Sequence, residues 1–214
     1  AGRHGVNLAG GDTTRGPLNL CLTAIGEVPA GTALRRDGAM PGDDLWVSGQ
    51  PGLAALGLAH LQQRTRLPDE LAARCVNALQ NPWPRIELGL ALRERGLARA
   101  AIDVSDGLLA DLGHLLQRSR LAGRVSLAAL PPLPAVADPA LARQCQLAGG
   151  DDYELAFAAP PAKRGELAAL ALELALPLWR CGETCAGEGG TLTVWDAHGK
   201  AVAVNERGFD HFGH

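Results

Sequence analysis

Apolar and polar positions along the chain follow two periods, which predict a mixture of strands and helices. Short apolar runs and strict alternation predict strands, whereas apolar residues about three to four positions apart predict helices. The predicted strands are 5–8, 18–23, 45–47, 100–104, 125–129, 154–157, 192–195 and 201–204. The predicted helices are 52–63, 68–79, 87–95, 108–118, 139–147 and 163–175. Because the two patterns alternate, the expected fold class is α/β or α+β with mixed sheets.

Composition narrows the classes of protein that remain. The 214 residues, 47% of them hydrophobic, suit one large domain or one domain and part of another, and they exclude a disordered chain. The net charge of −3 argues against a nucleic-acid partner, which usually meets a basic surface. The apolar stretch 167–179 is interrupted by Glu173 and Pro177 and is too short to span a membrane.

Lysine is scarce, and this excludes one class of phosphate site. Only Lys163 and Lys200 are present, and neither follows the glycine spacing of a P-loop. Phosphate chemistry here must therefore use arginine, backbone amides or a metal. The 5 cysteines are odd in number and irregularly spaced, which predicts reduced thiols in a cytosolic protein. Cys181 and Cys185 lack two further ligands at metal-site spacing, so we interpret them as packing residues.

Three acidic clusters stand beside glycines at the ends of predicted elements. They are Gly10-Gly11-Asp12-Thr13-Thr14, Asp103-Val104-Ser105-Asp106-Gly107 and Gly149-Gly150-Asp151-Asp152-Tyr153-Glu154. Glycine lets a backbone approach an anion closely, and carboxylates at strand ends hold hard cations such as Mg²⁺, which bridge to phosphates. Asp103 and Asp106 are spaced to address one metal group. Ser105 lies between them, just ahead of a helix N-terminus that favours anions.

Each cluster taken alone also has a purely structural interpretation. Asp106 can cap the helix that begins near 108, Asp12 can form an Asx turn, and the pair Asp151-Asp152 can be a solvated turn. Three such clusters in one chain favour a metal–phosphate site. The pair Arg35-Arg36 is either a surface pair or a phosphate clamp, since arginine forms bidentate contacts with phosphate.

Five motifs, taken together, resemble a known family. In chain order they are Gly10–Pro17, Pro41-Gly42-Asp43, Ile102–Leu108, Gly149–Leu155 and Gly208-Phe209-Asp210-His211-Phe212. Their order over the whole chain resembles the thiamine-monophosphate kinase family, and the closing motif is close to diagnostic. The resemblance implies membership of the superfamily that also holds aminoimidazole ribonucleotide synthetase and selenophosphate synthetase.

That resemblance implies a two-domain α/β fold and a phosphotransferase. In the family, the N-terminal domains pair to build a homodimer and ATP lies in a cleft fed by both domains. The implied reaction moves the γ-phosphoryl group of ATP onto thiamine monophosphate, giving thiamine diphosphate. On this expectation residues 1–32 are the C-terminal remnant of the N-terminal ATP-binding and dimerisation domain. Residues 33–214 are then the C-terminal α/β domain of the aminoimidazole ribonucleotide synthetase-like fold.

The resemblance also implies roles for individual residues, carried over position by position. The expected Mg²⁺ ligands, which form the catalytic apparatus, are Asp12, Asp103 and Asp106. The expected ATP contacts are Gly11, Asp12, Arg36 and Ser105. The expected contacts to thiamine monophosphate are Asp151 and an aromatic of the last motif, Phe209 ahead of Phe212. The family usually has glutamate at the position of Asp151, so the carboxylate there has a shorter reach.

Part of the family's site is expected to lie outside this sequence. The family begins with a segment that carries further metal-binding carboxylates, in a Gly-Asp-Asp motif and a Ser-Thr-Asp-Thr segment, and this sequence starts after both. We therefore expect the 214 residues alone to have little or no kinase activity. The full-length protein is expected to be a cytoplasmic homodimer.

The expected chemistry is direct in-line transfer without a phospho-enzyme. The acceptor is a phosphate monoester that is already ionised near neutral pH, so positioning and charge neutralisation suffice without a strong general base. Two alternatives stay open: another ATP-using synthetase or kinase of the same superfamily, and a non-catalytic dimerisation or nucleotide-binding module. A plain metal-binding protein is disfavoured, because histidine and cysteine are scattered and the acidic clusters lack an EF-hand pattern. No nucleic-acid or membrane partner is expected.

Overall fold

The computed structural model describes residues 2–203 of the chain. Contacts between Cα atoms divide it into two compact units, Ala1–Ala33 and Leu34–His214. Each unit is described by itself. The motif with Phe209 and Phe212, together with His211 and His214, lies outside the described residues.

The first unit has little regular structure. After a 3₁₀ turn, η1 (Gly2–His4), its backbone forms neither of the two predicted strands. Leu18, Leu20 and Leu22 are 95%, 84% and 92% exposed. The strand predictions for 5–8 and 18–23 are therefore wrong, because alternation alone does not make a strand. A strand also needs a neighbour that takes its backbone hydrogen bonds, and every described strand begins at or after Asp44.

The second unit is built on a mixed sheet. Its strands are β1 (Asp44–Ser48), β2 (Ala100–Val104), β3 (Ala122–Ser126), β4 (Glu154–Ala159), β5 (Leu178–Cys185), β6 (Leu192–Trp195) and β7 (Ala201–Val202). Their order in the sheet is β2-β4-β1-β5-β3-β6-β7, so β2 forms one edge. All neighbours are antiparallel except β3 and β6, which run parallel.

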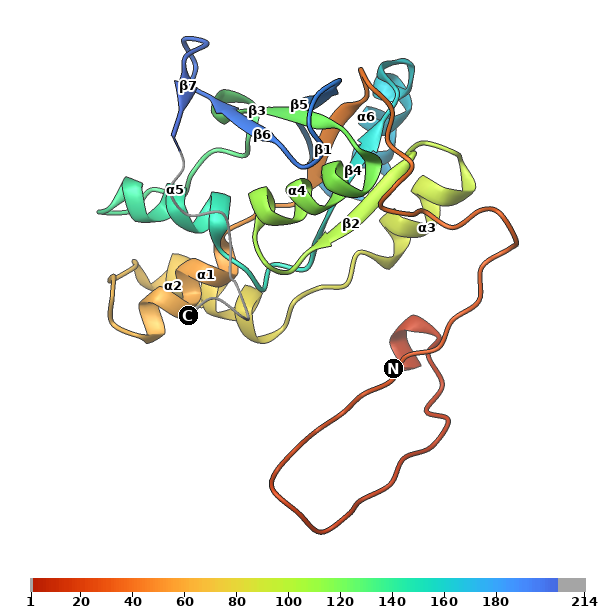
Figure 1. The fold of residues 1–214 in the computed structure, drawn as a ribbon. Coiled ribbons are helices and arrows are strands. Elements are labelled where there is room, and N and C mark those ends of the chain that lie inside the picture. The colour runs from red at the N-terminus through yellow and green to blue at the C-terminus, as the bar shows by residue number, and fades with distance from the viewer. Residues whose placement is uncertain (1, 204–214) are drawn as a thin grey trace. The chain divides into compact units, whose positions relative to one another are not determined.

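Helices cover both faces of this sheet, as Figure 1 shows. They are α1 (Leu53–Leu61), α2 (Asp69–Gln80), α3 (Ile86–Glu94), α4 (Leu108–Ser119), α5 (Pro139–Ala148) and α6 (Arg164–Glu173), with short 3₁₀ turns η2 (Leu127–Ala129) and η3 (Pro161–Lys163). The apolar stripe of α4, which includes Leu112, Leu115 and Leu116, packs on one sheet face. Residues of α3 and α6 pack with Trp46 and Phe157 on the other face. A third apolar cluster joins α1, α2 and α5.

Most of the predicted elements of this unit are confirmed, and so is the mixed α/β class. The β2 and β6 ranges match residue for residue, and the helices agree within a few positions. The predicted strand 125–129 is wrong over 127–129, which form η2, because β3 begins and ends earlier in the chain. The periodicity also missed β5, which lies inside the sheet between β1 and β3. Gly182 and charged neighbours interrupt its apolar pattern. A Cβ at Gly182 would lie 2.0 Å from the Arg124 carbonyl oxygen, so close strand approach explains the glycine.

The cysteines of the described chain are all free thiols. Cys181 is fully buried in the core beside α4, and its Sγ donates to the Leu45 carbonyl oxygen at 3.4 Å. Burial raises the pKa of this thiol to about 12. The interpretation of Cys181 as a packing residue is therefore confirmed. Among residues 2–203, no helix combines the length and the apolar character needed to cross a bilayer.

Candidate active site

The second and third acidic clusters meet at the edge of the sheet. Strands β2 and β4 are antiparallel neighbours, and their register places Val104 opposite Glu154. Beyond the ladder, the Asp151 N–H donates to the Ser105 carbonyl oxygen at 2.9 Å, and the Tyr153 N–H donates to Val104 at 2.8 Å. A Cβ at Gly150 would lie 2.4 Å from the Ser105 carbonyl oxygen, so only glycine allows this approach. Backbone bonds thus join two clusters that lie far apart in sequence.

A residue that the sequence analysis missed organises the turn before α4. Asp111 is buried, and its Oδ2 accepts the N–H groups of Ser105, Asp106 and Gly107 at 3.0, 3.0 and 3.2 Å. Burial raises the pKa of Asp111, while these backbone donors lower it. The only sequence signal was an acidic residue in the first turn of a predicted helix, where the helix dipole favours it.

The capping role considered for Asp106 is wrong. The N-cap of α4 is Gly107, with φ of 124°, and no side chain makes a cap hydrogen bond there. The free N–H groups of the preceding turn are instead satisfied from within the helix, by Asp111. The Asp106 side chain is therefore placed for a role other than capping.

A cleft of about 730 Å³ runs along α4. Its lining residues are Arg36, Ser105, Asp106, Asp111, His114, Gln117, Arg118 and Arg120. Three of the residues predicted from sequence, Arg36, Ser105 and Asp106, are thus brought together. A parallel bridge between Arg35 and Ala100 at the β2 edge places Arg36 at this cleft. The Ser119 hydroxyl also donates to the Arg36 carbonyl oxygen at 2.9 Å.

Asp103 lies beside this cleft but outside its lining. Its Oδ1 is 3.6 Å from the Arg36 guanidinium, and both side chains are about half exposed. Within residues 2–203, candidate ligand atoms of Asp106, Asp111 and His114 lie within 4.8 Å of one another, and Asp103 is not in that group. Whether Asp103 and Asp106 address one ion stays a prediction.

The donor set at this end of the cleft fits Mg²⁺. Mg²⁺ takes oxygen ligands and is usually held by one or two carboxylates together with substrate phosphates. Asp106 and Asp111 supply carboxylate oxygens, and one oxygen of Asp111 is already engaged by the three backbone donors. The His114 imidazole suits transition metals better than Mg²⁺. The two carboxylates are therefore the natural metal ligands here.

Gly11 and Asp12 belong to the first unit. Asp12 is exposed, and its Oδ1 accepts the Thr13 N–H at 2.7 Å. This contact is to the next residue, whereas an Asx turn is closed by the N–H two residues on, so it does not test the Asx-turn interpretation. The roles of Gly11 and Asp12 toward nucleotide and metal stay predictions.

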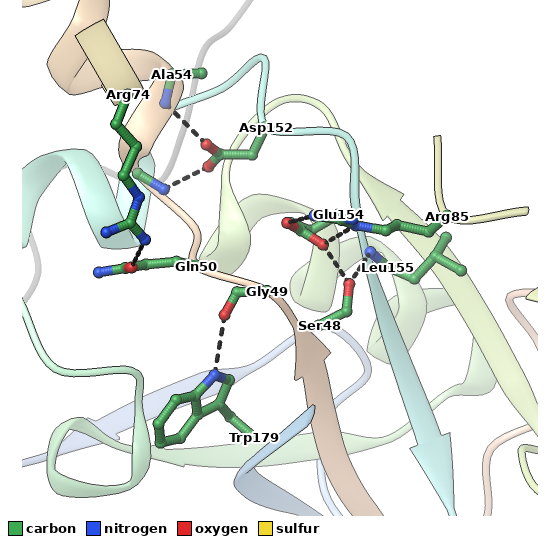
Figure 2. Close-up of polar contacts among 11 residues, drawn as sticks. Ser48, Gly49, Gln50, Ala54, Arg74, Arg85, Asp152, Glu154, Leu155 and Trp179 are labelled. Carbon is green, nitrogen blue, oxygen red and sulfur yellow. Dashed lines mark hydrogen bonds and ion pairs between the residues drawn. The ribbon is translucent and has the colours of Figure 1, made fainter. Parts of the chain in front are cut away.

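The two neighbouring aspartates of the third cluster have opposite environments. Asp151 is exposed and adopts a left-handed backbone, with φ of 67°. Asp152 instead points into the protein at the start of α1, where its carboxylate accepts the Gly52 N–H at 2.5 Å and the Ala54 N–H at 3.1 Å (Figure 2). The solvated-turn interpretation is therefore wrong for Asp152, which ties the loop that carries Asp151 to α1.

Burial raises the pKa of Asp152 from an ordinary 3.8 to about 7. Because the folded protein then holds the proton more tightly than the unfolded chain, Asp152 contributes its full stabilisation below about pH 4. That contribution is lost as the pH rises through 7. We expect Asp152→Asn to remove this slope, and the measurement is the free energy of urea unfolding at pH 4.5 to 8.

The control for this prediction is Asp69→Asn, which neutralises an exposed carboxylate in the first turn of α2. The control should keep the pH slope of the unchanged protein. An Asp152→Asn variant whose stability falls with pH as steeply as that of the unchanged protein would contradict the assignment.

A buried ion pair holds the other side of the same loop. The Glu154 carboxylate accepts bidentate bonds from Arg85 at 2.7 and 2.5 Å and a third bond from the Ser48 hydroxyl at 2.5 Å. Ser48 in turn accepts the Leu155 N–H at 2.9 Å, as Figure 2 shows. Between the two anchored carboxylates, Tyr153 stays 44% exposed, with φ of 51°. Buried anchors on both sides thus hold a strained loop, an arrangement typical of functional sites.

Comparison with known proteins finds a matching family model and similar curated proteins. The AIR synthase related protein, C-terminal domain, family matches residues 40–194. The chain is 43% identical over 213 residues to the thiamine-monophosphate kinase of Salmonella typhimurium. That match covers 98% of this chain and 64% of the relative, so the chain spans just under two thirds of the relative's length.

Solved structures are also similar to this chain. The crystal structure of a thiamine-monophosphate kinase from Stenotrophomonas maltophilia K279a is similar with a TM-score of 0.70 at 43% identity, covering 82% of this chain and 56% of that one. A structure described as AaThiL complexed with AMPPCP and TMP is similar with a TM-score of 0.66 at 28% identity. That similarity covers 84% of this chain and 54% of the other.

Proposed function

Because the chain belongs to the family of AIR synthase related proteins, C-terminal domain, we propose that it supplies one part of a thiamine-monophosphate kinase. The proposed reaction transfers the γ-phosphoryl group of ATP to thiamine monophosphate and yields thiamine diphosphate. The similarity to thiamine-monophosphate kinases over 98% of the chain supports this choice within the family. A relative solved with AMPPCP and TMP supports the two substrates.

One observation carries the proposal at the level of the site. The expected nucleotide contacts Arg36 and Ser105 line one cleft together with Asp106, and the loop of Asp151 is fastened to Ser105 by a backbone bond. A nucleotide in the cleft would therefore have its acceptor presented beside it. Effective phosphoryl transfer depends on this kind of positioning.

The cationic and the acidic residues of the cleft have different proposed roles. The Arg36 guanidinium favours phosphate oxygens, since arginine can bind them in pairs. Bound Mg²⁺ would neutralise the charge that two approaching phosphates accumulate. In this proposal Asp106 holds that ion and Asp151 orients the acceptor. No residue needs to abstract a proton, because the acceptor oxygen is already ionised.

The remaining assignments belong to the same proposal. Asp12 and Asp103 are proposed as further Mg²⁺ ligands, Gly11 as a nucleotide contact, and Phe209 ahead of Phe212 as the wall for the thiamine portion. Residues 1–32 are proposed as the end of a first domain and 33–214 as the second. The complete enzyme is proposed to be a homodimer in the cytoplasm. These assignments rest on the resemblance of the five motifs, and the identity of 43% with the Salmonella relative supports that resemblance.

The test is formation of thiamine diphosphate from ATP, Mg²⁺ and thiamine monophosphate, followed by chromatography. It is run on the complete product of the gene and on the 214 residues alone. We expect turnover by the complete product and little or none by the 214 residues, because the relatives extend well beyond the matched part. A chirally labelled γ-thiophosphate should be transferred with inversion, as direct in-line transfer requires.

Two outcomes would overturn the proposal: turnover of a different acceptor, and nucleotide binding without turnover. ADP release that depends on a different phosphorylated acceptor would assign the chain to another enzyme of its superfamily. Nucleotide binding without turnover of any acceptor by the complete gene product would assign it to a nucleotide-binding module.

A further inference from the structure

One loop, residues 149–153, connects α5 to β4 and carries Asp151. It begins in close contact with α1, because a Cβ at Gly149 would lie 2.4 Å from the Cβ of Ala55. Helix α1 in turn packs tightly on α5, since a Cβ at Gly52 would lie 2.6 Å from the α5 backbone. The packing of two helices therefore fixes the start of the loop.

Two residues of this loop have left-handed backbones, which residues other than glycine adopt at a cost in energy. They are Asp151, with φ of 67°, and Tyr153, with φ of 51°. The N–H groups of both are bonded to carbonyl oxygens at or just after the end of β2, at 2.9 and 2.8 Å. A bond at the N–H of Asp151 leaves its ψ angle free, however, unless the next residue is also held.

Asp152 is that next residue, and it is held from the other side. Its carboxylate accepts the Gly52 N–H at 2.5 Å and the Ala54 N–H at 3.1 Å (Figure 2). Both are donors at the start of α1 that the helix itself cannot satisfy. Asp151 therefore lies between two fixed points, its own N–H and the side chain of Asp152. Together they determine the backbone angles at Asp151 and thus the direction of its carboxylate.

Asp152 has no ion pair that would explain its position. Among residues 2–203, no salt bridge includes it, and the nearby Arg74 donates to Gln50 instead (Figure 2). A carboxylate that loses contact with water without gaining a cation is unfavourable, and serine or threonine can accept helix N–H groups without a charge. A role in holding the loop, beyond capping α1, accounts for the carboxylate at this position.

We propose that Asp152 is a positioning residue for the acceptor: its bonds to the first N–H groups of α1 fix the conformation in which Asp151 contacts thiamine monophosphate. This inference rests on the proposed function for the role of Asp151. It adds a residue that acts on acceptor affinity through its neighbour, without touching the substrate. The cleft along α4 does not depend on this contact.

The test is steady-state kinetics of thiamine diphosphate formation by the complete gene product. We expect Asp152→Ala to raise the KM for thiamine monophosphate by about tenfold, as loss of hydrogen bonds to a charged group does. The KM for ATP and kcat should stay within about threefold of the unchanged enzyme, because Asp151 binds the acceptor rather than the nucleotide. Asp152→Asn keeps an oxygen that accepts one N–H, so it should recover part of the affinity.

A double-variant cycle tests whether Asp152 acts through Asp151. Asp151→Ala should raise the KM for thiamine monophosphate at least as much as Asp152→Ala. The double variant should bind this acceptor no more weakly than Asp151→Ala alone, because the two residues act as one unit. Asp138→Ala is the matched control, since the exposed Asp138 carboxylate likewise accepts a helix N–H, that of Leu141 in α5. It should leave the KM for thiamine monophosphate unchanged.

Hydrogen exchange followed by mass spectrometry gives a second readout, which needs no turnover. In Asp152→Ala and Asp152→Asn, peptides that contain residues 150–153 should exchange faster than in the unchanged protein, because the loop is held on one side only. Peptides from α4 should exchange at the unchanged rate. If Asp152→Ala does not fold, Asp152→Asn alone decides both readouts, with a smaller rise of the same KM.

Four results would overturn the inference. They are an unchanged KM for thiamine monophosphate, an equal rise of the KM for both substrates, additive effects in the double variant, and unchanged exchange of the loop. Failure of the proposed function is distinguishable from these. In that case the unchanged gene product forms no thiamine diphosphate, while exchange of the loop still depends on Asp152.

Discussion

Replacing Asp106 by asparagine should lower the rate of phosphoryl transfer by about a thousandfold or more, because metal-mediated charge neutralisation supplies several kcal/mol of transition-state stabilisation. Asp106 is the carboxylate that lines the cleft, lies within 4.8 Å of the Asp111 and His114 ligand atoms, and does not cap α4. Asparagine keeps the shape of the side chain and removes its charge. The measurement is the formation of thiamine diphosphate by the complete gene product under saturating ATP and Mg²⁺.

A matched control and a second readout keep this prediction specific. Asp69→Asn removes an exposed carboxylate from the first turn of α2, away from the cleft, and should turn over normally. The Mg²⁺ concentration for half-maximal rate should rise in Asp106→Asn, while its melting temperature stays close to that of the unchanged protein. Turnover of Asp106→Asn within tenfold of the unchanged enzyme would remove Asp106 from the catalytic apparatus.

Breaking the ion pair between Glu154 and Arg85 should lower the free energy of unfolding by about 3 to 5 kcal/mol, the usual cost of stranding one partner of a buried pair. The Glu154 and Arg85 side chains are only 7% and 21% exposed, and their contact is bidentate. Glu154→Leu leaves the guanidinium with little access to water, and it also frees the Ser48 hydroxyl. Urea unfolding followed by circular dichroism measures the change.

The double variant Glu154→Leu/Arg85→Leu distinguishes a stranded charge from a lost contact. Removing both charges leaves no buried ion, so the double variant should be more stable than Glu154→Leu alone. Arg95→Leu is the control, since Arg95 and Glu173 form a bidentate pair that is about half exposed, and water screening should leave it little effect on stability. A double variant that is less stable than both single variants would contradict this account.

The local pattern of apolar and polar residues predicted most helices and strands of the second unit. Apolar residues at helical spacing predicted the stripe of α4, and the run 100–104, apolar except for Asp103, predicted β2. Both patterns follow from the burial of one face of an element. The sequence pattern did not predict β5. Glycine and charged residues interrupt its apolar pattern, and the glycine is needed because the neighbouring strand backbone lies too close for a side chain. In the first unit the error is the opposite one. The alternating pattern at 18–23 predicted a strand, and the structure describes none there.

The sequence likewise predicted some residues of the candidate site and missed others. Single motifs predicted Arg36, Ser105, Asp106 and Asp151 as functional residues, and the resemblance of the five motifs gave them roles. Asp111 was missed because its partners are backbone groups, which carry no residue-specific signal. Asp152 looked like a surface residue beside Asp151. Only the position of α1, about 100 residues earlier in the sequence, makes it a partly buried acceptor for the first N–H groups of that helix.

By itself, the sequence determined most local elements of the second unit and the family, because periodicity and short motifs are properties of neighbouring residues. The chemistry that it indicates is part of the proposal. Tertiary structure alone decided which loops meet, which of two adjacent aspartates is bonded to α1, and that Arg36 shares a cleft with Arg118 and Arg120. Those facts depend on contacts between segments brought together by packing. Such contacts follow from the burial of whole faces and the pairing of strands, which no short stretch of sequence encodes.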